Sequence, residues 1–247
     1  MIIEYHKFHS TYLNRDMEYK VYGKSGKPCL VFPAEGGRFD DFEKNGMIEE
    51  AQKYIDEGKI RFICCDSNYH ETWLDEDGDP AERMQKHECW YHYIVEELAP
   101  KILKTNEQET GEKQKLMTCG CSIGGFQALN IMLRRPDLFD LVLSMSAMLT
   151  SDYFMDYHDD LTYCNSPLTY LSQIDPNHEY IGQYNVSDIT LCCGQGSGEL
   201  DFVNMHKRIE QIFQEKGING WVTYWGYDVT HDFTWWRKQL SYFLQFL

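Results

Sequence analysis

The chain has 247 residues, of which 43% are hydrophobic and 15% aromatic, and this composition excludes a disordered or low-complexity protein. The length suits a single α/β domain over residues 1–247, which would bury roughly three quarters of the surface that the unfolded chain exposes. The 23 basic and 39 acidic side chains give a formal net charge of −16, which argues against nucleic acid or an anionic membrane as a partner.

The nine cysteines are an odd number, and several lie in apolar, strand-like runs, a pattern typical of reduced and buried thiols. The first residues lack the basic segment and apolar run of a secretory signal, so we expect a cytoplasmic location. No stretch approaches the roughly 18 apolar residues of a membrane span. Because no Cys-x-x-Cys or His-Glu-x-x-His spacing occurs, we expect neither a metal site nor a cofactor.

Short apolar runs alternate with longer segments of helical period, which predicts an α/β fold with a mostly parallel sheet covered by helices. The predicted strands are residues 18–22, 28–32, 60–65, 115–119, 141–146, 189–193 and 221–225. The predicted helices are residues 41–57, 83–104, 124–134, 203–216 and 233–246. Residues 151–186 are less periodic and rich in Tyr, Asp and Asn, and we interpret them as a small cap-like insertion over the active site.

The loop after the second predicted strand reads FPAEGGRF (residues 32–39). Its glycine pair lets the backbone approach a bound ligand closely. A phosphate-binding loop is not predicted, because no Lys-Ser/Thr follows and the Gly-x-Gly-x-x-Gly pattern is absent.

The segment GCSIG (residues 120–124) matches Gly-x-Ser-x-Gly, the tight strand-to-helix turn that raises a serine hydroxyl above the carboxyl edge of a sheet. An apolar run precedes it, and a helix whose first turn contains only small residues follows it. Ser122 is therefore the candidate nucleophile, and the alternative is a glycine-rich turn with an incidental serine. Cys121 occupies a variable position of the turn and is expected to pack away from the substrate.

Two later loops supply candidate partners for Ser122, because a serine hydroxyl needs a neighbouring base that a carboxylate orients. The chain order serine, acid, histidine points to the loop after the sixth predicted strand, where spacing alone does not separate Glu199 from Asp201. His231 lies between the last predicted strand and the last helix and is the candidate base. Its alternative role is to cap that helix, which Asp232 could do equally well.

Acyl transfer would place negative charge on a carbonyl oxygen, and each preorganised backbone N–H there contributes roughly 3–4 kcal/mol. We expect one donor to be the amide of Ile123, directly after the nucleophile. The second is expected from the glycine pair of the earlier loop, with Gly37 as the first choice and Gly36 as the second.

Four segments together resemble the putative-esterase branch of the α/β hydrolases, which contains esterase D, feruloyl esterases, enterochelin esterases and the mycobacterial mycolyltransferases. They are residues 32–39, the turn at Ser122, CGQG (193–196) and GYDVTHDFTWWR (226–237), and the likeness spans nearly the whole chain. In the mycolyltransferases a similar Cys-Gly-x-Gly loop carries a glutamate acid, so the resemblance implies Glu199 as the acid, His231 as the base and an oxyanion amide at Gly37. Mycolate transfer is not implied, because this chain lacks a leader and has many free cysteines.

From these residues we expect a carboxylic ester hydrolase that uses a Ser-His-Glu triad, through an acyl-enzyme, on a small-molecule ester. The candidate pocket residues are Arg38, Trp73, Tyr153 and Phe154, although packing is an equal explanation for the aromatics and Arg38 could anchor its own loop. The alternatives are an acyltransferase with the same triad and a noncatalytic ligand-binding protein of the same fold. The aromatic C-terminal helix could pack in the core or against another subunit, so a homo-oligomer stays open.

Overall fold

A computed structural model describes residues 1–247 and shows one sheet of eight strands in the order β1-β2-β4-β3-β5-β6-β7-β8. The strands are β1 (Ile3–Ser10), β2 (Arg15–Tyr22), β3 (Lys27–Phe32), β4 (Ile60–Cys65), β5 (Leu116–Cys121), β6 (Phe139–Met145), β7 (Asp188–Cys193) and β8 (Trp221–Tyr224). Pairing is antiparallel between β1 and β2 and between β2 and β4, and parallel elsewhere. The carboxyl ends of β3 to β8 therefore meet at one edge of the sheet.

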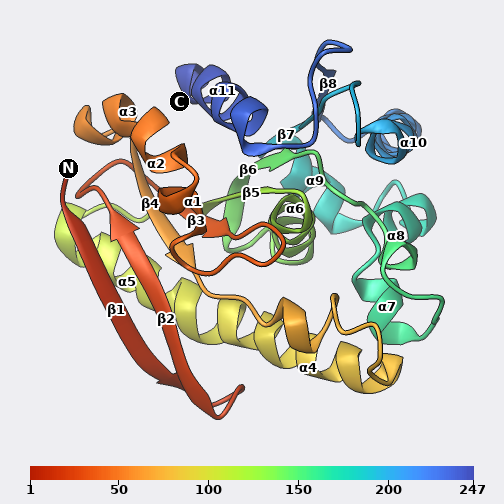
Figure 1. The fold of residues 1–247 in the computed structure, drawn as a ribbon, viewed down its shortest axis with the longest axis horizontal. Coiled ribbons are helices and arrows are strands. Elements are labelled where there is room, and N and C mark those ends of the chain that lie inside the picture. The colour runs from red at the N-terminus through yellow and green to blue at the C-terminus, as the bar shows by residue number, and fades with distance from the viewer.

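Helices cover both faces of this sheet (Figure 1). They are α1 (Asp41–Lys44), α2 (Met47–Glu50), α3 (Gln52–Asp56), α4 (Pro80–His92), α5 (Ala99–Thr110), α6 (Ile123–Arg134), α7 (Asp160–Cys164), α8 (Pro167–Gln173), α9 (Glu179–Asn185), α10 (Leu200–Lys216) and α11 (Phe233–Phe243). A core of 23 buried residues lies under α1 to α3 and α11, and one of 44 lies under α4, α5, α6 and α10. The predicted mostly parallel sheet flanked by helices is confirmed.

The sequence analysis missed one strand and predicted one helix wrongly. The missed strand is β1, whose side chains are mostly exposed because this strand forms the outer edge of the sheet. The helix predicted over residues 41–57 is broken into α1, α2 and α3. The first break falls at Gly46, whose φ of 73° is a left-handed conformation that glycine adopts without steric cost.

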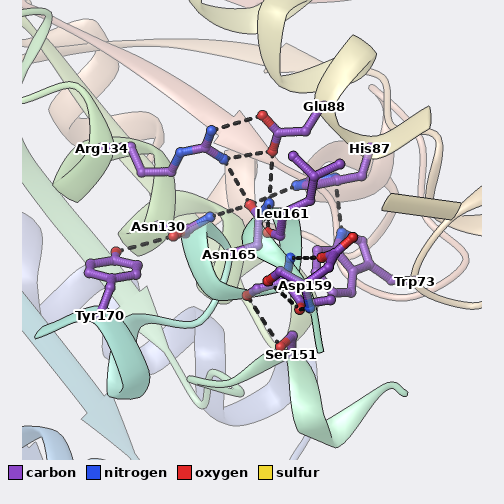
Figure 2. Close-up of polar contacts among 11 residues, drawn as sticks. Trp73, His87, Glu88, Asn130, Arg134, Ser151, Asp159, Leu161, Asn165 and Tyr170 are labelled. Atoms are coloured by element: carbon purple, nitrogen blue, oxygen red, sulfur yellow. Dashed lines mark hydrogen bonds and ion pairs between the residues drawn. The ribbon is translucent and has the colours of Figure 1, made fainter. Parts of the chain in front are cut away.

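The segment 151–186 forms a short 3₁₀ turn (Ser151–Tyr153) followed by α7, α8 and α9. Asn165, at the end of α7, ties it to the core (Figure 2): Asn130 and Arg134 of α6 donate to Asn165 Oδ1 at 2.7 and 2.9 Å. Asn165 Nδ2 in turn donates to Glu88 of α4 at 2.8 Å. The insertion is therefore joined to the C-terminal half of α6 through Asn165, while α7 also packs on α4 and α8 on α10.

No helix of the structure combines the length and the apolar character needed to cross a membrane. The C-terminal helix α11 packs in the core through Trp236, Leu240 and Phe243, whereas Tyr242 on the same helix is exposed.

Candidate active site

Ser122 lies at the turn between β5 and α6, with φ +56° and ψ −125°. Glycines are required on both sides of Ser122. A Cβ at Gly120 would lie 2.3 Å from the carbonyl carbon of Gly124. A Cβ at Gly124 would lie 2.4 Å from the carbonyl oxygen of Phe32. A left-handed backbone at a non-glycine residue is a strained conformation that the surrounding structure must impose. Here the tight packing of β3, β5 and α6 imposes it and turns the serine toward the carboxyl edge of the sheet.

His231 contacts Ser122 directly, with His231 Nε2 3.0 Å from Ser122 Oγ. The loop that carries His231 ends at Asp232, whose carboxylate accepts hydrogen bonds from the backbone N–H groups of Thr234 and Trp235. Asp232 is thus the N-cap of α11. The imidazole is not needed for capping and is free to face the serine.

Two aromatic rings hold the imidazole plane of His231. Phe202 of α10 stacks on it with the ring centroids 4.5 Å apart and an interplanar angle of 15°. Trp236 of α11 meets it edge-on at 4.9 Å and 86°. The side chain of His231 is 20% exposed, so one part of the ring remains open to solvent. Sequence reasoning missed Phe202, which looks like any other apolar position of an amphipathic helix.

Glu199 lies behind His231, and its carboxylate is fully buried. Its Oε1 is 3.4 Å from His231 Nδ1, but Nδ1 and Glu199 Oε2 both lack a hydrogen-bond partner, so the pair is close and not yet aligned for a hydrogen bond. Asp201 is exposed in the first turn of α10. The structure therefore brings Glu199, and not Asp201, together with Ser122 and His231.

The loops that carry Glu199 and His231 are fastened to each other. The N–H of Gly196 donates to the carbonyl of Val229 at 2.8 Å. At Gly194, a Cβ would lie 2.2 Å from that same carbonyl oxygen. Only glycine permits this approach, which explains the glycines of the CGQG segment as spacers that let the two loops touch.

The two candidate oxyanion donors differ in the structure. Ile123 is the first residue of α6, so its N–H has no acceptor within the helix. The N–H of Gly37, by contrast, donates to the carbonyl of Ala34 at 3.0 Å in a tight turn. Gly37 thus stays a prediction whose N–H is engaged in a turn, whereas the second choice, Gly36, has an N–H that forms no hydrogen bond within the chain.

A buried carboxylate fixes this glycine loop. Asp41 Oδ2 accepts from the N–H of Ala34 at 2.9 Å, and Asp41 Oδ1 accepts from the side chain of Asn45 at 2.8 Å. Burial raises the pKa of Asp41, and these two hydrogen bonds oppose that rise. A Cβ at Gly37 would lie 2.5 Å from the carboxyl carbon of Asp41, so glycine is needed there for packing.

Two of the four predicted pocket residues have structural roles. Arg38 forms ion pairs with Glu18 at 2.5 Å and with Asp66 at 2.6 Å, so it anchors its own loop. Trp73 is 1% exposed and donates from Nε1 to His87 Nδ1 at 3.0 Å (Figure 2). The prediction that Trp73 lines the pocket was wrong, because this ring belongs to the core.

The other two predicted pocket residues belong to an aromatic row that reaches His231. Tyr153 is 45% exposed, and its ring lies 5.9 Å from that of Phe202 and 5.3 Å from that of Phe154. Since Phe202 stacks on the imidazole, the row leads from the base to the start of the 151–186 insertion. It offers an apolar wall beside the candidate nucleophile.

No group of three or more His, Cys, Asp or Glu side chains is arranged to hold a metal ion. The arrangement itself offers a hydroxyl beside an imidazole, a buried carboxylate behind the imidazole, and the N–H of Ile123 at the start of α6.

Several solved structures resemble the chain over nearly its whole length. The solved structures that resemble the chain include a ferulic acid esterase, with 18% identity and a TM-score of 0.75 over 99% of this chain and 96% of that one. They also include an S-formylglutathione hydrolase from Agrobacterium tumefaciens, with 13% identity and a TM-score of 0.72 over 99% and 93% of the two chains. MPT51 from Mycobacterium tuberculosis matches at 14% identity and a TM-score of 0.72, over 99% and 97%.

A search of curated protein sequences finds no match. The family model named Esterase, with the description "Putative esterase", matches residues 10–247, which is nearly the whole chain. The resemblance noted in the sequence is thus confirmed: the chain has the α/β-hydrolase fold and belongs to this esterase family.

Proposed function

We propose that the chain is a carboxylic ester hydrolase that works as a single domain over residues 1–247 and acts through a Ser-His-Glu triad. The observation that carries this proposal is the contact of 3.0 Å between His231 Nε2 and Ser122 Oγ, with the buried carboxylate of Glu199 behind the imidazole. A serine hydroxyl beside a neutral imidazole is the arrangement that generates a nucleophile near neutral pH.

In the proposed reaction, His231 Nε2 takes the proton of Ser122 Oγ as that oxygen attacks the ester carbonyl carbon. The imidazolium then gives this proton to the leaving alcohol, and an acyl-enzyme remains on Ser122. Water, deprotonated by the same imidazole, attacks the acyl-enzyme and releases the acid. Glu199 orients the ring and stabilises its positive charge through Nδ1.

The negative charge that develops on the carbonyl oxygen would be held by backbone N–H groups. The amide of Ile123 is one proposed donor, because it follows the nucleophile at the start of α6 and has no helical acceptor. Gly36 is the second, because its N–H is free whereas that of Gly37 is used in the turn.

The proposed substrate is a small-molecule ester with an apolar acyl or alcohol group against Tyr153 and Phe202. The similar structures include proteins described as a ferulic acid esterase and as S-formylglutathione hydrolases. An aryl ester and a thioester therefore belong in the test beside simple alkyl esters.

The test is a panel of p-nitrophenyl esters of increasing acyl length, a feruloyl ester and S-formylglutathione, with the wild type and Ser122→Ala. We expect the wild type to hydrolyse at least one ester and Ser122→Ala to lose at least about a thousandfold in kcat/KM. Ser197→Ala, at an exposed serine of the loop before Glu199, is the matched control and should behave as the wild type. Equal rates in wild type and Ser122→Ala would refute the proposal, and product analysis with added alcohols separates hydrolysis from acyl transfer.

A further inference from the structure

The segment directly after β6 holds a buried hydroxyl that the triad does not include. We propose that Ser146 is a positioning residue that acts on His231 through the carboxylate of Glu199, an inference that rests on the proposed function and deepens it. Ser146 is completely buried, and its Oγ lies 2.7 Å from Glu199 Oε1.

The direction of this hydrogen bond is fixed by a third side chain. Trp236 Nε1 lies 3.1 Å from Ser146 Oγ, and an indole N–H can only donate. The single hydroxyl proton of Ser146 is therefore left for Glu199, which as a carboxylate can only accept. Trp236 thus donates to Ser146, and Ser146 donates to Glu199 Oε1. This same oxygen lies 3.4 Å from His231 Nδ1.

Glu199 depends on this hydroxyl, because its carboxylate is fully buried and Ser146 is its only hydrogen-bond donor in the chain. Its other oxygen, Oε2, has no partner. A buried carboxylate without donors is costly. The hydroxyl of Ser146 consequently sets the position of Oε1 and takes up part of its negative charge.

The backbone around Ser146 also links the acid to the nucleophile. The carbonyl of Met145 accepts a hydrogen bond from the N–H of Ser122 at 2.8 Å, and the N–H of Ser146 donates to the carbonyl of Cys192 at 2.7 Å. Ser146 has φ +48°, a strained conformation for a serine. Glycine would adopt this backbone more easily, so the serine side chain carries a conformational cost there.

Three further ionisable groups lie around Glu199. The thiols of Cys192 and Cys193 of β7 and the imidazole of His206 of α10 are close enough to interact with it electrostatically. Burial raises the pKa of Cys192 far above its usual range and that of Cys193 to about 12, and it lowers the pKa of His206 to about 4. All three are uncharged around pH 7, so a change at Glu199 is felt by His231.

The effect of removing the hydroxyl has a definite sign. The O–H dipole of Ser146 stabilises the ionised carboxylate. Without it, the carboxylate and the imidazole together hold a proton more tightly, because the negative charge of Glu199 is less compensated. The imidazole is then deprotonated only at a higher pH, so the acid limb of the pH–rate profile moves to higher pH.

The experiment compares Ser146→Gly and Ser146→Ala with the wild type. Both variants lack the hydroxyl, but Ser146→Gly also relieves the backbone strain, so a shared defect belongs to the hydroxyl and not to the backbone. The matched control is Ser144→Ala, since Ser144 is equally buried on β6 and donates to the carbonyl of Gly125 at 2.9 Å, outside the triad. The readout is the rate at which a fluorophosphonate probe labels Ser122 as a function of pH, with the thermal midpoint of unfolding measured beside it.

We expect both variants at position 146 to label about tenfold more slowly at neutral pH and to show an acid limb about half a unit higher. Trp236→Phe, which keeps a six-membered aromatic ring beside His231 and loses the indole N–H with part of the buried ring, should shift the limb in the same direction by less. Ser144→Ala should change the thermal midpoint and leave the pH profile in place.

Three results would overturn the inference. The first is a pH profile unchanged in both variants at position 146, while labelling still depends on Ser122; the proposed function would then stand. The second is an equal shift in Ser144→Ala. The third is a wild type that neither labels nor hydrolyses any ester, which would remove the proposed function as well.

Discussion

The two ends of α6 hold buried polar groups of opposite kinds. At the N-terminal end, Ser122 is strained, and His231 Nδ1 and Glu199 Oε2 lack hydrogen-bond partners. Near the C-terminal end, the amide of Asn165 is fully used: its Oδ1 accepts from three donors and its Nδ2 donates to two acceptors (Figure 2). A saturated network rigidifies the core around it, whereas the groups near Ser122 keep unused hydrogen-bonding capacity.

The difference predicts separate roles for the two ends of α6. The N-terminal end, with Ser122, should control activity with little effect on stability. The end around Asn165 should control stability with little effect on activity, because its groups are already satisfied and face no substrate.

The largest effect is expected from Glu199→Gln. The amide has nearly the same shape but no charge with which to stabilise the imidazolium of His231, so kcat/KM should fall by about a thousandfold or more, with an unchanged far-UV spectrum. Asp201→Asn is the matched control and should keep wild-type kinetics, since Asp201 is exposed. If Asp201→Asn lost as much activity as Glu199→Gln, the assignment of the acid would be wrong.

The second effect belongs to the opposite end of the helix. Asn165→Leu has a similar volume but leaves the side chains of Asn130 and His87 without their acceptor, which should lower the free energy of unfolding by roughly 3 kcal/mol. The kcat/KM of the folded fraction should stay within about twofold. Urea unfolding gives the first quantity and ester hydrolysis the second. Asn204→Leu, at an exposed position of α10, should change neither, and a stability loss there as large as at Asn165 would contradict the argument.

The third effect is a loss of stability in acid, also at the Asn165 end. Burial lowers the pKa of His87 to about 4, whereas a histidine of the unfolded chain titrates near 6.5. Between these values the unfolded state binds more protons, so the free energy of unfolding falls as the pH falls through this range. Near the lower end of this pH range, His87 alone lowers the free energy of unfolding by about 3 kcal/mol.

Urea unfolding between about pH 7 and about pH 4.5 measures this dependence. His206 should add a similar share, because burial also lowers its pKa to about 4. His87→Gln should therefore remove about half of the pH dependence, and His158→Gln, at an exposed position, should remove none. An undiminished pH dependence in His87→Gln would show that His87 is not held neutral in the fold.

The smallest effect is expected at Phe202, which is buried and also stacks on His231. Phe202→Leu keeps an apolar side chain but loses the stacked face against His231, so kcat should fall by about fivefold through looser orientation of the base. Phe213→Leu, at a buried position of the same helix, should cost similar stability with no change in kcat. Equal kcat losses in the two variants would mean that stacking does not orient the imidazole.

The sequence predicted the fold well because the central strands are short apolar runs. The strand β4 was predicted with the bounds that the structure has, and all of its residues are buried. The strand β1 was missed because an edge strand with exposed faces carries no such run. The break at Gly46 was missed because amphipathic spacing continues across it, and only the backbone shows the left-handed turn.

The site was predictable where a local motif encodes it. Ser122 follows from the glycine spacing that a tight turn requires, and His231 from its place after the last strand. The hydrogen bond of the Gly37 N–H to Ala34 was not predicted, because hydrogen bonding within a loop is not visible in its composition. Ser146 and Phe202 have no motif at all, and the one signal for Ser146 was a small polar residue at the carboxyl end of a predicted strand.

The burial of the thiols has a consequence for chemoselectivity. Seven of the nine cysteines are buried, among them Cys121 next to the nucleophile. Burial raises the pKa of Cys121 well above its usual range, and a thiol reacts with electrophiles only as its thiolate. In the proposed reaction, the adjacent sulfur therefore does not compete with Ser122 for the acyl group by forming a thioester.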